Sequence, residues 1–344
     1  MPITQAMLLA AGFSTRLRPL TNDIPKPLLP FLHLQLLDFT LAYLKYFGIK
    51  SLAVNVHHGK EKFLGELKKI TSPKIIPFIE EKILGTGGGI KNMKSFVTED
   101  TFIVVNCDFI TDIDLRDAVR FHKEKKALAT MVLIPHPHAK KYGEIGISSQ
   151  GRIIKFPYGK HAGAKAYRKG LFSGIHIFDR SIFDEMPTQN VFCVNREVYA
   201  PLIDRRAPVY GYLAKAKWYD VGELKQLALA QFELLDYDDN NWDVSYWSKL
   251  LQTSFKRSKN IFVSSAATLH PSVRLKGPVL IAKEAKISAR TILGPNVIIG
   301  SRAQISQNCQ IENAVVFPQA KVLDSSKISK QFYIKESNTV LWDS

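Results

Sequence analysis

Short apolar runs alternate with amphipathic stretches over the first two thirds of the chain. The runs AMLLA, LAVNV, IIPFI, FIVVN, ATMVLI and GIHIF have the length of buried strands, and LLDFTLAYLKYFG and EKFLGELKKI have the spacing of helices. This alternation predicts an α/β domain with a largely parallel or mixed sheet. We place it at residues 1–230. A helical linker at 231–262, interrupted by the polar segment DYDDNN, is expected to follow.

The last quarter of the chain repeats with a period of six. Neither a helix nor a strand has this period, whereas a solenoid of short parallel strands turns one aliphatic side chain inward per face. The pattern resembles the hexapeptide repeat of left-handed β-helices, so we assign residues 263–334 to such a domain, with Gly294 and Gly300 at corners. The large apolar series is Leu269, Leu275, Ile281, Ile287, Leu293, Ile299, Ile305, Ile311, Phe317 and Leu323. A second, smaller series lies two residues before it, and Cys309 belongs to this series as a core residue.

Composition and charge narrow the class of protein. With 46% hydrophobic and 23% charged residues the chain is globular, and it lacks an apolar run long enough for a membrane helix and the charged start of a signal peptide. We therefore expect a cytoplasmic protein. The three cysteines are widely spaced, which argues against disulfides and structural zinc. The net charge of +16 favours an anionic partner, and the part from Phe255 onward carries half of it, with thirteen basic and five acidic residues.

A loop of small residues follows the first apolar run, in LAAGFSTRLRPLTNDIPKPLLPF. Such a loop brings backbone N–H groups close to a phosphate chain, and Arg16 and Lys26 add positive charge. The prolines flanking Lys26 predict an extended backbone there. Neither a P-loop nor a G-x-G-x-x-G fingerprint is present, which disfavours P-loop kinases and dehydrogenases. The segment resembles the signature of the sugar-1-phosphate nucleotidyltransferases, with Ala11 and Ser14 where that family often has glycine.

The resemblance implies a nucleotidyltransferase domain with a Rossmann-like fold and a set of contact residues. Further matches in family order are EEKILGTGGGI, IVVNCDFITDIDL, KYGEIGI with SGIHIF, and WYDVGELKQL. The glycines Gly87, Gly88 and Gly89 would let a base or sugar approach the backbone. The implied nucleotide contacts are Leu9, Ala10, Ala11, Gly12, Glu80 and Gly85, and the implied sugar contacts are Gly143 and Gly174, beside Tyr142.

Two carboxylates complete the implied site. Asp108 and Asp220 resemble the family's ligands for Mg²⁺, although Asp108 could instead cap a strand end and Asp220 could cap a helix. The family's E-K-P motif is absent after GRIIKF, so its role in sugar recognition is not transferred to this chain. His57, His58, His136 and His138 lack a metal-ligand pattern and are expected to be structural or exposed.

The implied reaction is attack of a sugar 1-phosphate oxygen on the α-phosphorus of a nucleoside triphosphate, which releases pyrophosphate. Arg16 and Lys26 would hold the leaving phosphates. The two-part architecture resembles mannose-1-phosphate guanylyltransferases, which favours GTP and mannose 1-phosphate. The motif LGTGGGI also resembles N-acetylmuramate-1-phosphate uridylyltransferases and heptose-1-phosphate guanylyltransferases.

Three other classes remain as alternatives. An acyltransferase is disfavoured because the six-residue register is expected to run unbroken from Ala267 to Leu323, with His270 its one histidine. A silent regulatory paralogue that binds nucleotide sugars is disfavoured by the retained charged residues. A nucleic-acid-binding protein would explain the charge but not the motifs. A homo-oligomer is expected, because β-helices commonly pack against one another.

Overall fold

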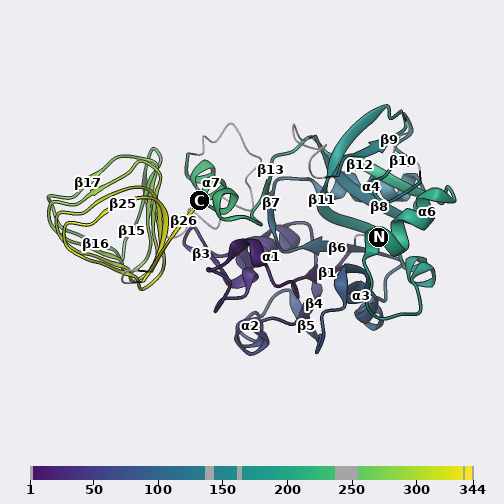
Figure 1. Ribbon diagram of the computed structural model, residues 1–344, viewed down its shortest axis with the longest axis horizontal. Coiled ribbons are helices and arrows are strands. Elements are labelled where there is room, and N and C mark those ends of the chain that lie inside the picture. The colour runs from purple at the N-terminus through teal and green to yellow at the C-terminus, as the bar shows by residue number, and fades with distance from the viewer. Residues whose placement is uncertain (1–2, 136–142, 161–164, 237–254, 336–337, 343–344) are drawn as a thin grey trace. The chain divides into compact units, whose positions relative to one another are not determined.

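The computed structural model describes residues 3–135, 143–160, 165–236, 255–335 and 338–342. The chain forms two compact units (Figure 1). The first unit comprises Met1–Phe13, Asp23–Pro27 and Tyr43–Trp218, and the second comprises Ser14–Asn22, Leu28–Ala42 and Tyr219–Ser344. Most of the expected linker, including DYDDNN from Tyr237 onward, lies outside the described residues. No helix in the described part of the chain is long and apolar enough to span a membrane.

A mixed sheet forms the centre of the first unit, as the alternating pattern predicted. Its strand order is β10-β9-β11-β6-β1-β4-β5, and β8 joins β11 to β12. The pairs β1–β4, β1–β6, β4–β5 and β8–β12 are parallel, whereas β11 runs antiparallel to β6, β8 and β9. The strands are β1 (Gln5–Leu9), β4 (Ser51–Val56), β5 (Lys74–Ile79), β6 (Thr101–Asn106), β8 (Ala129–Ile134), β9 (Ile145–Ile147), β10 (Ile153–Lys155), β11 (Arg168–Asp179) and β12 (Val209–Leu213).

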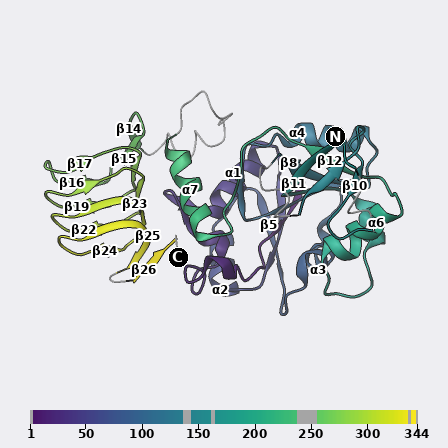
Figure 2. The ribbon, with the colours of Figure 1, turned by 45° about the horizontal axis from the view of Figure 1, so that its top comes forward.

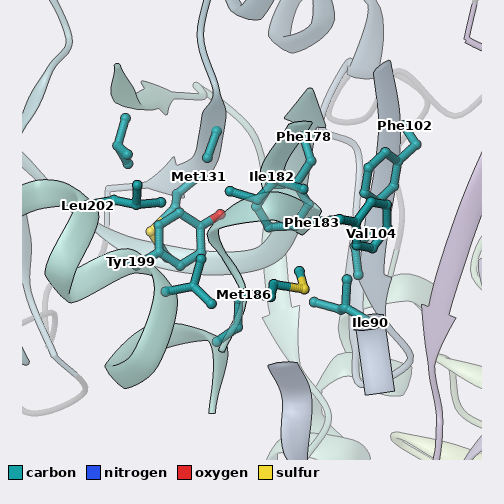
Figure 3. Packing of buried hydrophobic residues seen from close by; sticks show 14 of the residues in the cluster. Ile90, Phe102, Val104, Met131, Phe178, Ile182, Phe183, Met186, Tyr199 and Leu202 are labelled. Atoms are coloured by element: carbon teal, nitrogen blue, oxygen red, sulfur yellow. The ribbon is translucent and has the colours of Figure 1, made fainter. Parts of the chain in front are cut away.

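Aliphatic and aromatic side chains pack together in the core of the first unit (Figure 3). The rings of Phe102 and Phe183 stack with centroids 5.3 Å apart. Strands β6 and β8 are buried along nearly their whole length, which explains why their sequences are continuous apolar runs. The helices are α1 (Leu36–Tyr46), whose residues belong to both units, α2 (Lys60–Leu67), α3 (Gly85–Asn92), α4 (Leu115–Glu124) and α6 (Ala200–Asp204).

The other short elements are the 3-10 helices Thr15–Leu17, Lys26–Leu28, Lys94–Phe96 and Arg180–Glu185, the π-helix Asn195–Tyr199, and the strands β2 (Pro30–Phe31), β3 (Leu34–Gln35), β7 (Phe109–Thr111) and β13 (Trp218–Asp220).

Stacked parallel strands form most of the second unit (Figure 2). From β15 to Ile311 of β23 the parallel strands pair at a separation of 18 residues, as in Val279↔Val297 and Lys286↔Gln304, so three six-residue segments separate successive partners. The strands are β14 (Phe255–Ser258), β15 (Ile261–Ser264), β16 (Thr268–Leu269), β17 (Arg274–Leu275), β18 (Val279–Ile281), β19 (Lys286–Ile287), β20 (Ile292–Leu293), β21 (Val297–Ile299), β22 (Gln304–Ile305), β23 (Gln310–Val316), β24 (Lys321–Val322), β25 (Lys327–Lys335) and β26 (Asn338–Leu341).

Left-handed backbone conformations mark the turns between these strands. Gly294 has φ +108°, and a Cβ there would lie 1.7 Å from the carbonyl oxygen of Lys276, so its expected corner role is confirmed. Non-glycine residues with positive φ follow one another at intervals of six and then five: Glu284, Arg290, Asn296, Arg302, Asn308 and Asn313.

The expected unbroken register is wrong beyond Ile311. Val297 pairs with Ala314, and Ile305 pairs with Val322, so these partners are 17 residues apart instead of 18. The coil between them is therefore one residue shorter than the coils before it. Val316 and Val322 occupy the inward positions, whereas Leu323 is 54% exposed. The six-residue period does not reveal this shift, because the sequence AVVF contains adjacent apolar residues. A step of six from Ile311 therefore still reaches an apolar residue, Phe317. Cys309 is fully buried in the core, as predicted.

Antiparallel strands and a helix complete the second unit. β14 pairs antiparallel with β15 at the start of the stack, and β26 pairs antiparallel with β25 at its end. Helix α7 (Leu224–Leu235) contributes Phe232, whose ring contacts Trp342, and Trp342 in turn contacts Phe332 of β25.

Candidate active site

The loop of small residues and Asp108 leave the same edge of the sheet in the first unit. Strands β1 and β6 are parallel neighbours, and Leu9 pairs with Asn106. Ala10, which follows β1, and Asp108, which follows β6, therefore lie beyond the carboxyl ends of adjacent strands. This edge is where open α/β sheets bind their ligands.

Lys26 and Asp108 form an ion pair at this edge. The Lys26 side chain is 7% exposed, and its Nζ lies 3.1 Å from Oδ2 of Asp108, whose side chain is 35% exposed. The extended backbone predicted at Lys26 is wrong, because Lys26–Leu28 is a 3-10 helix. Its second residue is a proline, which is tolerated because the first turn of a helix does not need that N–H.

A buried hydrogen-bond network supports the loop after β1. Asn55, at 4% exposure, accepts a hydrogen bond from the Ala10 N–H at 2.6 Å and donates one through Nδ2 to Glu80 Oε1 at 2.7 Å. Glu80 Oε2 accepts a hydrogen bond from the Leu84 N–H at 3.0 Å. The structure thus uses both oxygens of Glu80 to order the backbone. Asn55 was not among the predicted site residues. Its one signal in the sequence is its position as a polar residue within the buried strand LAVNV.

The glycines of LGTGGGI pack against protein rather than line an open surface. They lie in α3, and Gly87, Gly88 and Gly89 are buried. A Cβ at Gly88 would lie 2.1 Å from the Asn190 carbonyl oxygen, and one at Gly85 would lie 2.6 Å from that of Phe192. The side-chain space of Gly87 and Gly88 is taken by the segment at 190–194, and that of Gly89 by Asn55 and Glu80, so the missing side chains of the triplet make room for protein atoms.

Gly12 has open space where a side chain would be. A Cβ built there meets no heavy atom within 4 Å. Ala10 and Ala11 before it are 8% and 6% exposed, and Leu9 ends β1. Phe13 is 47% exposed, and its ring contacts those of His57 and His58. His57 also bonds through Nδ1 to the Glu80 carbonyl oxygen at 2.7 Å, so it has the structural role that we expected.

The two predicted sugar-contact glycines have different neighbours. Gly174 has φ +90°, and a Cβ there would lie 3.0 Å from the ring of Phe109 and 3.2 Å from Asn106 Nδ2, so it borders the segment that carries Asp108. Gly143 has φ +95°, and a Cβ there would lie 3.3 Å from Pro157. Tyr142, His136 and His138 lie outside the described residues.

In the second unit the structure brings Arg16 and Asp220 together. Arg16 Nη1 lies 3.0 Å from Glu223 Oε1 and 4.0 Å from Asp220 Oδ2. Asp220 Oδ1 accepts a hydrogen bond from the Gly222 N–H at 2.7 Å. The N-cap position of α7 is Glu223 rather than Asp220, so the alternative helix-cap role of Asp220 is wrong. Glu223 was not among the predicted site residues, because nothing in the motif WYDVGELKQL sets this glutamate apart.

Cys107, the residue before Asp108, has a buried thiol. Burial raises the pKa of Cys107 to about 12, and the negative charge of Asp108 acts in the same direction. The described residues contain no group of three or more His, Cys, Asp or Glu side chains arranged to hold a metal ion.

Comparisons with known proteins agree with the motifs. The family described as Nucleotidyl transferase matches residues 5–236, and the GMPPB C-terminal domain matches residues 275–341. A UTP–glucose-1-phosphate uridylyltransferase of Synechocystis is 27% identical over 92% of this chain and 84% of its own. A mannose-1-phosphate guanylyltransferase of Mycobacterium tuberculosis is 26% identical over 92% of this chain and 80% of its own.

A solved structure supports the fold. The crystal structure of HddC from Yersinia pseudotuberculosis superposes with a TM-score of 0.57 at 22% identity, covering 67% of this chain and all of that one. The family match spans well over half of the chain and includes Lys26 and Asp108. The chain therefore belongs to the nucleotidyl transferase family, among its sugar-1-phosphate nucleotidyltransferases, which confirms the membership predicted from the motifs.

Proposed function

We propose that the protein transfers a nucleotidyl group from a nucleoside triphosphate to a sugar 1-phosphate, with GTP and mannose 1-phosphate as the preferred pair. The buried Lys26 ammonium beside Asp108, at the carboxyl edge of β1 and β6, is the observation that carries the proposal. It places a cation and a carboxylate next to a loop whose Gly12 leaves room for a ligand. Such a site suits a triphosphate.

Each residue in the proposal has a defined task. Leu9, Ala10, Ala11 and Gly12 form the nucleotide-binding loop: the Ala10 N–H donates to Asn55 and fixes the loop, and the N–H groups of Ala11 and Gly12 bind phosphate oxygens. Lys26 and Arg16 neutralise the β- and γ-phosphates as they leave. Glu80 acts through the Asn55 network, which holds the Ala10 backbone, and Gly85 lets the backbone turn into α3. No protein nucleophile takes part, because the sugar phosphate oxygen attacks the α-phosphorus directly.

The donor set suits a magnesium ion. Asp108 and Asp220 offer hard carboxylate oxygens and are partly exposed, at 35% and 31%. Mg²⁺ is commonly held by one or two carboxylates together with water and substrate phosphates, so two protein ligands are sufficient. When bound, the ion would neutralise phosphate charge. Lys26 and Arg16 would then exchange their carboxylate partners for phosphate oxygens.

Two observations favour GTP and mannose 1-phosphate. The GMPPB C-terminal domain matches residues 275–341, and similar proteins from bacteria, plants, a fungus and a frog are named mannose-1-phosphate guanylyl- or guanyltransferases. A second candidate, UTP with glucose 1-phosphate, is favoured by the similarity to the Synechocystis enzyme of that name. N-acetylmuramate 1-phosphate remains a further uridylyltransferase substrate to test.

The architecture is part of the proposal. We infer that residues 263–334 form a left-handed parallel β-helix that follows a catalytic domain at 1–230 and a linker at 231–262. The 18-residue pairing register and the left-handed turn residues support the β-helix. A homo-oligomer that packs through it is tested by light scattering, and a monomer at working concentrations would contradict it.

A pyrophosphate-release panel of four nucleoside triphosphates against several sugar 1-phosphates tests the reaction. The highest kcat/KM is expected for GTP with mannose 1-phosphate, and a higher value for UTP with glucose 1-phosphate would favour the second candidate. Asp108→Asn should lower turnover at least ~10²-fold, the scale of one lost electrostatic contact in the transition state. Asp117→Asn, an exposed carboxylate on α4, is the matched control. Near wild-type turnover of Asp108→Asn would refute the metal assignment, and no release with any pair would refute the function.

A further inference from the structure

Asn195 carries a buried hydrogen-bond acceptor that the fold does not use. Its Oδ1 is inaccessible to solvent and accepts no hydrogen bond from any residue that the structure describes. Asn195 also begins the π-helix Asn195–Tyr199. An unsatisfied buried acceptor costs about 1–3 kcal/mol, and π-helical turns occur frequently at functional sites. Both features call for an explanation beyond folding.

The residues just before Asn195 are tied to the glycine helix α3. The Phe192 carbonyl oxygen accepts a hydrogen bond from the Gly87 N–H at 3.0 Å. The Val194 N–H donates a hydrogen bond to Thr86 Oγ1 at 3.1 Å. Asn195 is therefore anchored to the segment that follows Gly85, a predicted nucleotide contact.

The residue after Asn195 leads to the predicted sugar contact. The Arg196 guanidinium lies 5.4 Å from the centroid of the Tyr158 ring. Tyr158 follows Pro157, which lies within 3.3 Å of a Cβ built at Gly143. Asn195 thus lies between the segments predicted to contact the nucleotide and the sugar.

We propose that Asn195 is a sugar-recognition residue whose Oδ1 accepts a hydrogen bond from a hydroxyl group of the sugar 1-phosphate. This inference rests on the proposed function. An amide oxygen suits the task because it accepts from a hydroxyl without placing a negative charge near the sugar's phosphate. Asn195 as a whole is partly exposed, and the proposal requires a rotation about χ2 that brings Oδ1 from its buried position to the ligand.

The substitution Asn195→Leu separates recognition from structure, because leucine has a similar size and no acceptor. Removing an unsatisfied polar group should leave Tm unchanged or raise it. Asn55→Leu is the matched control: the same change there breaks the hydrogen bonds with Ala10 and Glu80 and should lower Tm. Asn195→Ala serves as a second variant if the leucine variant does not fold.

Kinetics complete the test. In Asn195→Leu the KM for the sugar 1-phosphate should rise about tenfold, the scale of one hydrogen bond to a neutral group, while the KM for the nucleoside triphosphate stays unchanged. Monodeoxy analogues identify the hydroxyl: one analogue should lose about as much kcat/KM with the wild type as the leucine variant loses with the natural sugar. The variant itself should not discriminate against that analogue.

Two results would overturn the assignment. An unchanged KM for the sugar 1-phosphate would show that the acceptor does not meet the sugar. A lower Tm with a rise in both KM values, as expected for Asn55→Leu, would show a structural role. Failure of the wild type to release pyrophosphate with any substrate pair is a different result, because it refutes the proposed function itself.

Discussion

Acid should destabilise the first unit through His176. Its ring is buried between Phe172, Phe178 and Tyr199, and Nδ1 bonds to the Tyr199 hydroxyl at 2.8 Å. Burial lowers the pKa of His176 from 6.5 to about 3. Below pH 6.5 the unfolded chain therefore binds a proton that the folded protein does not accept, and stability falls as the pH falls.

The size of the effect follows from linkage. Between pH 6 and pH 4.5 a histidine with these two pKa values removes about 2 kcal/mol of stability. The assay is urea unfolding, followed by circular dichroism, at pH 6.0, 5.5, 5.0 and 4.5. The reference is the double variant His176→Phe with Tyr199→Phe, in which both hydrogen-bonding partners are replaced together so that neither is left unsatisfied.

The comparison isolates the histidine. Carboxylates and His122, whose pKa burial also lowers to about 4, titrate in both proteins and cancel in the difference. The wild type should lose about 2 kcal/mol more than the double variant over this range. Parallel dependence of the two proteins on pH would refute the reasoning, because it would mean that His176 is protonated as easily in the folded state as in the unfolded one.

Two further predictions concern glycines and thiols. Gly88→Ala should destabilise the protein by about 1–3 kcal/mol in urea unfolding, because its Cβ would lie 2.1 Å from the Asn190 carbonyl oxygen. Gly12→Ala, placed in open space, should keep its stability but weaken triphosphate binding in calorimetry; equal stability of the two variants would contradict this account. In the native protein iodoacetamide should modify Cys193, which is partly exposed, and spare Cys107 and Cys309, which are buried. Peptide mass spectrometry locates the label, and labelled Cys107 would show that its burial and raised pKa are wrong.

The apolar pattern predicted the elements better than it predicted the site. Strands such as FIVVN form where expected, because a short, β-branched apolar run is stable in a strand that is buried on both faces of a sheet. The hexapeptide period likewise predicted the stacked strands, but not the short coil at Asn313. Adjacent apolar residues there fit both a six-residue and a five-residue spacing. The strand pairing that selects one spacing cannot be read from the residue types.

The candidate site was likewise predicted in part. Lys26 and Asp108 were predicted as charged residues of motifs, and the structure supplies what motifs cannot: that they touch and that Lys26 is buried. The sequence did not point to Asn55, Glu223 or Asn195. Asn55 and Glu223 stand out only through contacts with residues distant in sequence. Asn195 stands out only because its buried Oδ1 has no hydrogen-bond donor among the described residues. The sequence could not show that Gly87 and Gly88 pack against protein, because their partner, the segment at 190–194, lies about a hundred residues away.

The antiparallel strands β14 and β26 affect how a second copy of the chain could extend the sheet to which they belong. A stack of parallel strands has unpaired backbone groups at both ends, and a second copy could extend it without limit, as in a fibre. Here the chain reverses direction at each end of the same sheet, so the outermost strand no longer offers the parallel continuation of the repeat. Within this sheet, a second copy that continued the parallel repeat would have to pair with a strand of the opposite direction, so parallel extension of the repeat is disfavoured at both of these ends.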